Sequence, residues 1–159
     1  MINVLPIATT MLAALLSIEP LHLDGYAALT PAFTLMATYY WTIYRPDLLP
    51  PAWLFLIGTI QDLLSGGLPG ETAVTLLLAR AILLPQRHYF VDRPFPFIWA
   101  GFTLLTGGAV LLSWALHSLL AAELLDLRGP VLRAVLTISA FPIASFLLGR
   151  SQRALIGAD

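Results

Sequence analysis

Two charged side chains, Asp62 and Arg80, interrupt long apolar runs of this sequence. An arginine near the middle of a bilayer costs about 2.5 to 3.5 kcal/mol, so it must face protein or water and find an acceptor. Two alternatives follow for Arg80: an ion pair with Asp62 on the preceding antiparallel helix, or independent snorkelling towards the lipid headgroups. In either case a structural role is favoured over a catalytic one.

Clusters for catalysis or metal binding are not visible in the sequence. His22, His88 and His117 fall in three separate segments, a spacing that does not build a metal site. The serines have neither a Gly-x-Ser-x-Gly context nor a nearby histidine on a helix. A lone intramembrane aspartate lacks the second carboxylate of an aspartyl protease. With no cysteine in the chain, we expect no enzyme, no metal site and no cofactor.

The elements that hold these residues must be surrounded by lipid. The chain has 159 residues, of which 58% are hydrophobic and 11% are charged. Soluble domains carry roughly 25% charged residues, because a polar surface must face water. The net charge of -1 offers no basic face, so no binding to nucleic acid is expected.

About 20 helical residues cross the hydrocarbon core of a bilayer, and six stretches are long and apolar enough to do so. We predict an all-α polytopic membrane protein, with residues 1–159 as one integral membrane domain. The predicted spans are about 2–18, 25–44, 48–64, 72–86, 97–122 and 132–149. The uncharged run 94–122 exceeds the core, so its first residues are expected at the interface, and either one tilted helix or two pieces fit it.

Arginines near the helix ends predict that both termini face the cytoplasm. Five arginines then lie on the inner side and two on the outer side: Arg45, Arg87, Arg93, Arg150 and Arg153 against Arg128 and Arg133. Six aromatic residues are expected to form a belt at the inner interface: Tyr39, Tyr40, Trp41, Tyr44, Trp53 and Trp99.

Glycines mark one turn and one helix face. Gly66 and Gly70 predict a tight outer turn after the third span, since glycine supplies positive φ at a helix end. Gly101, Gly107 and Gly108 in the fifth span allow close approach of another helix, either from this chain or from a partner.

The second to fourth spans carry a distinctive series of residues. In chain order they are Pro31, Tyr40-Trp41, Arg45-Pro46, Pro50, Gly58-x-x-x-Asp62, Ser65-Gly66 and Leu68-x-Gly70. This series resembles the central signature of the MreD family, the rod shape-determining membrane proteins of bacteria. The chain length and the six hydrophobic spans agree with that family as well.

The resemblance implies a noncatalytic inner-membrane scaffold of the cell-elongation (rod-shape) complex. Members of the family associate with MreC, and through it with MreB, RodA and the elongation transpeptidase, and so help to position peptidoglycan synthesis. A structural or partner-binding role is expected for nine residues: Asp62, Arg80, Gly58, Gly66, Gly70, Arg45, Pro46, Tyr40 and Trp41.

A second class of function stays open. The MreD family is thought to share its six-helix arrangement with the substrate-binding subunits of vitamin uptake transporters. On that alternative the chain is a transport subunit that binds a small molecule or a lipid, and Asp62, Arg80 and nearby aromatic residues contact the ligand. A pocket of this kind needs several convergent polar groups on an apolar wall.

Overall fold

The computed structural model describes residues 4–18, 32–66 and 68–155, and all regular structure in these ranges is helical. The α-helices are α1 (Val4–Ile18), α2 (Phe33–Tyr44), α3 (Pro51–Ser65), α4 (Glu71–Leu83), α5 (Arg87–Val91), α6 (Phe95–Ala121) and α7 (Arg128–Leu155). Two short 3-10 helices join them, η1 (Pro46–Leu48) and η2 (Leu84–Gln86). Because α6 and α7 are each long and apolar enough to cross a bilayer, the predicted fold class, an all-α polytopic membrane protein, is confirmed.

Within the described ranges, a helix lies in each of the six predicted spans, from 12 residues in α2 to 28 in α7, and the short α5 is an addition. Residues 25–31 of the second predicted span lie outside the described residues. That every helix crosses the bilayer, and that both termini face the cytoplasm, stay predictions.

Prolines set several helix ends. Pro51 and Pro96 stand in the first turns of α3 and α6, where a missing N–H costs nothing. Pro85 ends α4 early, so the fourth predicted span finishes in η2 rather than in α-helix. The run from Phe95 to Ala121 is a single helix, and α7 extends beyond the predicted span 132–149 at both ends.

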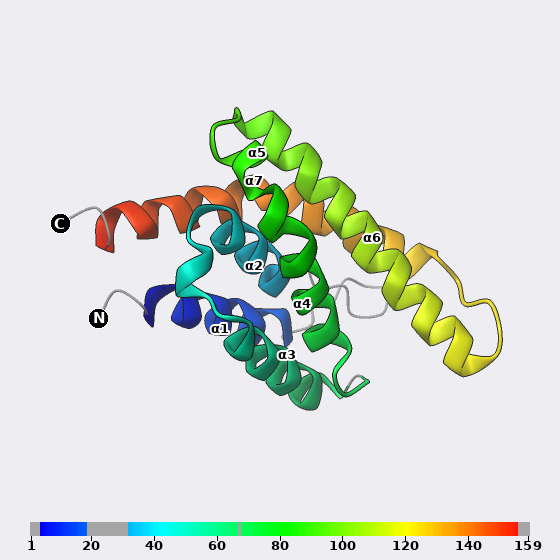
Figure 1. Ribbon diagram of the computed structural model, residues 1–159. Helices are drawn as coiled ribbons and strands as arrows, with labels where there is room; N and C mark the ends of the chain where they lie inside the picture. The colour runs from blue at the N-terminus through cyan, green and yellow to red at the C-terminus, as the bar shows by residue number, and fades with distance from the viewer. Residues whose placement is uncertain (1–3, 19–31, 67, 156–159) are drawn as a thin grey trace.

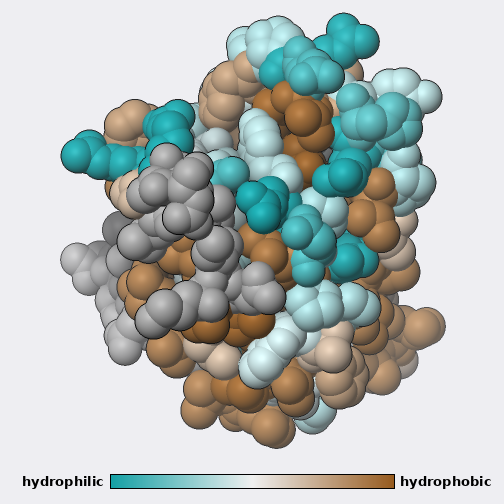
Figure 2. All heavy atoms as spheres, turned by 60° about the vertical axis from the view of Figure 1, so that its left-hand side comes forward, coloured by the Kyte–Doolittle hydropathy of each residue, from teal (hydrophilic) through white to brown (hydrophobic). Residues whose placement is uncertain are grey.

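The helices run back and forth between two sides of the molecule (Figure 1). The start of α1, the end of α7 and the α2–α3 connection lie towards the left of this view, whereas the α3–α4 turn and the α6–α7 loop lie at the lower right. Figure 2 turns the left side forward and shows hydrophilic residues across the middle and upper part of that face, with hydrophobic surface below them. Such a division suits a chain whose connections lie at the two boundaries of a bilayer.

Helix α2 lies at the centre of the helix bundle. Ten of its twelve residues are buried, and it contacts α1, α4, α5, α6 and α7. The ring of Tyr39 meets Phe102 and Phe141 edge-on at centroid distances of 5.2 and 5.5 Å, and these two phenylalanines stack on each other at 4.2 Å. Aromatic contacts between α2, α6 and α7 therefore form the middle of the core.

The expected aromatic belt is wrong for three residues of α2. Tyr39, Tyr40 and Trp41 are only 0%, 6% and 0% exposed, so their rings fill the core. Their polar atoms bind within the protein, with Tyr39 Oη donating to the carbonyl of Ile98 at 2.7 Å and Trp41 Nε1 donating to Thr9 Oγ1 at 2.9 Å. Because these groups are satisfied internally, they need no contact with lipid headgroups.

Candidate functional site

The turn between α3 and α4 depends on two glycines. Gly66 has φ = 70° and ends α3, and Gly70 has φ = 88° and precedes α4. L-residues with side chains rarely adopt these values, because the Cβ atom approaches the neighbouring carbonyl. The glycine pattern thus encodes a tight connection between two antiparallel helices.

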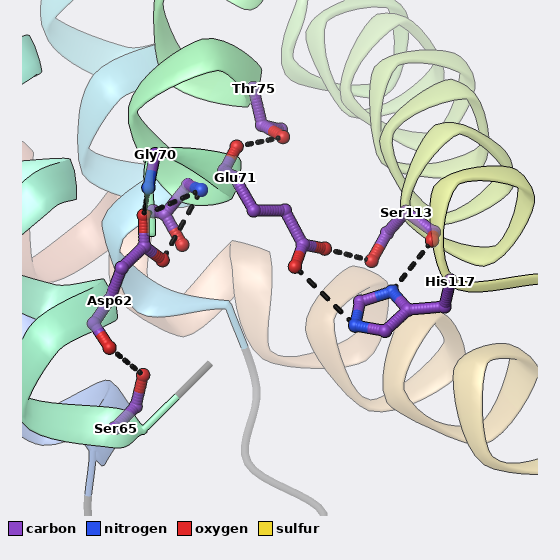
Figure 3. Close-up of polar contacts among 8 residues, drawn as sticks. Asp62, Ser65, Gly70, Glu71, Thr75, Ser113 and His117 are labelled. Atoms are coloured by element: carbon purple, nitrogen blue, oxygen red, sulfur yellow. Dashed lines mark hydrogen bonds and ion pairs between the residues drawn. The ribbon is translucent and has the colours of Figure 1, made fainter. Parts of the chain in front are cut away.

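Asp62 caps α4 from the neighbouring helix. Its side chain lies near the end of α3 and is 4% exposed. Oδ2 accepts hydrogen bonds from the backbone N–H groups of Gly70 and Thr72, both at 3.0 Å (Figure 3). The first N–H groups of a helix have no partner within the helix, and the positive end of its dipole favours a carboxylate. Asp62 therefore holds the turn and the start of α4 in place.

Gly58 brings the backbones of α3 and α4 into contact, one turn before Asp62. A Cβ atom at this position would lie 2.5 Å from the Cα and 2.6 Å from the N of Ala73 on α4. No side chain larger than hydrogen fits this separation without moving a helix. Gly58 therefore sets the spacing of the helix pair that Asp62 caps.

Arg80 fixes the opposite end of this helix pair. Its Nε donates to the carbonyl of Leu49 at 3.2 Å and its Nη2 donates to the carbonyl of Pro46 at 3.3 Å. The ion pair with Asp62 considered for Arg80 is not formed, because Asp62 caps the first turn of α4 whereas Arg80 extends towards the far connection. Two loop carbonyls, rather than the Asp62 carboxylate, accept hydrogen bonds from this guanidinium.

The remaining signature residues lie near the same connection. Pro46 begins η1 and supplies a carbonyl to Arg80, while Arg45 Nε lies 3.8 Å from Asp47 Oδ1. Tyr40 Oη donates to Gln152 Oε1 on α7 at 2.7 Å. The nine residues singled out from the sequence thus divide into two groups. The group towards the α3–α4 turn contains Gly58, Asp62, Gly66 and Gly70. The group towards the α2–α3 connection contains Tyr40, Trp41, Arg45, Pro46 and Arg80, and Arg80 joins α4 to that connection.

A polar cluster that was not predicted joins α4 to α6. Figure 3 shows Glu71 reaching from the first turn of α4 to Ser113 and His117. Ser113 Oγ donates to Glu71 Oε1, and His117 Nε2 lies 3.5 Å from Glu71 Oε2. The statement that no histidine stands near a serine on a helix is wrong, since Ser113 and His117 are separated by one helical turn.

This cluster differs from a nucleophilic pair in its connections. The Ser113 hydroxyl is bonded to Glu71, and His117 Nδ1 lies 2.8 Å from the backbone carbonyl of Ser113 rather than from its hydroxyl. A nucleophile needs its base within hydrogen-bond reach. Among the residues that the structure describes, no group of three metal-binding side chains is placed to hold a metal ion.

A cavity of about 370 Å³ lies beside this cluster, between α2, α4, α6 and the start of α7. Glu71 and Ser113 line it on one side and Arg133 lines it on another. Asp62 and Arg80, the residues assigned to a ligand on the transport alternative, do not line this cavity. The sequence pattern did not group Glu71 with Arg133 because they lie on different helices far apart in the chain.

One of three comparisons with known proteins finds a match. The family model described as rod shape-determining protein MreD matches residues 1–148, a range that includes every residue of the two groups described above. No curated protein matches the chain, and no solved structure matches it. The likeness to the substrate-binding subunits of vitamin uptake transporters therefore stays a prediction.

Proposed function

The chain belongs to the MreD family of rod shape-determining proteins, and from this premise we propose that it is a noncatalytic scaffold that holds an MreC-like single-span partner. Membership of the family implies a role in rod-shape determination in the bacterial cytoplasmic membrane. The match over residues 1–148 is the observation on which this proposal rests. Through its partner the scaffold would reach MreB, RodA and the elongation transpeptidase, and so help to position peptidoglycan synthesis.

A scaffold needs a surface that is formed before the partner arrives, because ordering a loop on binding costs affinity. The α3–α4 pair supports this requirement, since Asp62 fixes one end and Arg80 fixes the other. Next to the capped turn, Leu63 and Leu64 are 67% and 58% exposed. We assign part of the partner contact to this turn.

A lateral groove of about 360 Å³ between α4 and α6 suits a single transmembrane helix. Its wall contains Ala79, Gly101, Gly108 and Ala109, and small residues let two helix backbones approach closely in lipid. The space beside Gly101 is already filled by this chain, since a Cβ atom there would lie 2.6 Å from Phe90 Cε1. A Cβ atom at Gly108 meets no atom within 4 Å. We therefore place the partner helix against Gly108.

We expect Gly108→Leu to lower the amount of MreC-like partner recovered with the tagged chain about tenfold, because added methylene groups in a packed contact cost about 1–3 kcal/mol. Gly107→Leu is the matched control, since Gly107 is equally open but does not line the groove. The measurement is quantitative mass spectrometry of partner isolated from native membranes. Equal recovery with both variants would place the partner elsewhere.

A transport subunit that binds a small molecule or a lipid is the second candidate function. The cavity beside Glu71 favours ligand binding, because a carboxylate, a guanidinium and several hydroxyl groups line it. Binding of a ligand there is compatible with the scaffold, because Gly108 lines the groove but not the cavity.

A further inference from the structure

Two opposite charges line the same cavity without touching. Glu71 lies on α4 and Arg133 on α7, and no ion pair between them is formed, although they are near enough for their charges to interact. Glu71 is held by Ser113 and His117. Arg133 is an exposed residue at the cavity wall, and its guanidinium has no hydrogen bond or ion pair to any residue that the structure describes. The cavity thus offers an unused cationic donor opposite a positioned carboxylate.

A buried hydroxyl group on the cavity wall also lacks a partner. Thr106 lines the cavity and is 1% exposed, yet its Oγ1 has no hydrogen bond. By contrast, the hydroxyl of Thr103 on the same helix donates to the carbonyl of Trp99 at 2.9 Å. An unsatisfied buried hydroxyl costs about 1–3 kcal/mol, but this oxygen is shielded from the cavity, so a ligand could reach it only after a rotation of the Thr106 side chain.

The cavity lies near the starts of α4 and α7, which the predicted spans place at the level of the lipid headgroups. Glu71 is the first residue of α4, and Gly129 and Pro130 in the first turn of α7 line the wall near Arg133. The positive end of the α7 dipole favours an anion, although the N–H groups of Arg128 and Val131 are already bonded, to Asp126 Oδ1 and to the Leu127 carbonyl. Leu35 and Val110 supply apolar wall for the glycerol and upper acyl segments of a lipid.

We propose that this cavity binds a zwitterionic lipid headgroup that carries a phosphate and a primary ammonium group. The phosphate lies against Arg133 and the start of α7, where a guanidinium can bind two phosphate oxygens at once. The ammonium donates to Glu71. A purely anionic headgroup would face the Glu71 carboxylate and a purely cationic one would face Arg133, so a ligand with both charges is favoured. This site extends beyond the scaffold proposal and is separate from Gly108 in the partner groove.

The test uses the purified full chain in detergent with an equimolar mixture of phosphatidylethanolamine, phosphatidylglycerol and phosphatidylcholine of matched acyl chains. We expect native mass spectrometry to show phosphatidylethanolamine retained in preference to the other two lipids. Arg133→Gln should lower its retention about tenfold, since a hydrogen bond to a charged group contributes about 1.5–3 kcal/mol. Glu71→Gln should remove the preference over phosphatidylglycerol. Arg128→Gln, on the same helix but outside the cavity wall, should leave retention unchanged.

Equal retention of the three lipids, or no retention by the wild-type chain, would overturn the proposal. Soluble phosphoethanolamine forms a second arm: displacement of the bound lipid supports recognition of the headgroup, whereas binding of this solute without any lipid binding overturns the lipid assignment. If Glu71→Gln fails to fold, the comparison of Arg133→Gln with Arg128→Gln decides the test. Because no partner protein is present, failure here leaves the scaffold proposal unaffected.

Discussion

Replacing Gly58 with leucine is expected to force α3 and α4 apart and to prevent stable accumulation of the protein in the membrane. The new Cβ atom would lie 2.5 Å from the Cα of Ala73, so the clash is with backbone and no rotamer relieves it. Overpacking of a core costs about 1–3 kcal/mol and occasionally more. We expect at least the upper end of that range, because moving α4 away also weakens the cap at Asp62. Membrane abundance and the melting temperature in detergent would measure the effect.

Gly107→Leu is the control for this experiment, since it introduces the same side chain where no atom lies within 4 Å of the new Cβ. It should accumulate like the wild-type chain. Normal abundance and an unchanged melting temperature of the Gly58→Leu protein would show that α3 and α4 do not make this backbone contact.

Asp62→Ala is expected to lower the free energy of unfolding by about 2–4 kcal/mol and to reduce recovery of the MreC-like partner. The substitution leaves the N–H groups of Gly70 and Thr72 without their acceptor, and each unsatisfied buried group costs about 1–3 kcal/mol. The α3–α4 turn then loses its fixed shape. Asp62→Asn keeps one side-chain oxygen, and one oxygen can accept from both N–H groups as Oδ2 does, so this variant should recover part of the stability.

Equal stability of the Asp62→Ala and wild-type proteins would contradict the capping role. The double variant Asp62→Ala with Arg80→Ala separates the cap from an ion pair. If the two residues act at opposite ends of α4, their effects on the free energy of unfolding should add within about 0.5 kcal/mol. A larger coupling energy would indicate that Asp62 and Arg80 interact directly, which would contradict the separate contacts seen in the structure.

The six long helices could be predicted because lipid leaves few alternatives for an apolar chain. Each backbone polar group in hydrocarbon must be bonded internally, so long uncharged runs form helices. Proline and glycine correctly predicted the two ends of α3, which begins at Pro51 and is followed by Gly66, because both residues act on the local backbone. Pro85 ended its helix earlier than the hydropathy pattern indicated, because hydropathy does not register a missing N–H.

The polar contacts were harder to predict, because spacing along the chain defines depth in the membrane but not the direction of a side chain. The sequence indicated that a buried Asp62 needs a partner, but the partners are backbone N–H groups at the start of α4 and not the Arg80 side chain. Tyr39 was predicted at the inner interface but faces the core. The spacing of Ser113 and His117 was readable in the sequence, whereas their partner Glu71 is brought to them only by the packing of α4 against α6.

Affinity isolation of the tagged chain from native membranes would test the scaffold proposal most directly. After mild cross-linking, we expect an MreC-like single-span protein to be recovered in roughly equal amount with the wild-type chain and in reduced amount with Gly108→Leu. Recovery of the folded chain without any such protein, under conditions that preserve other membrane complexes, would contradict the proposal.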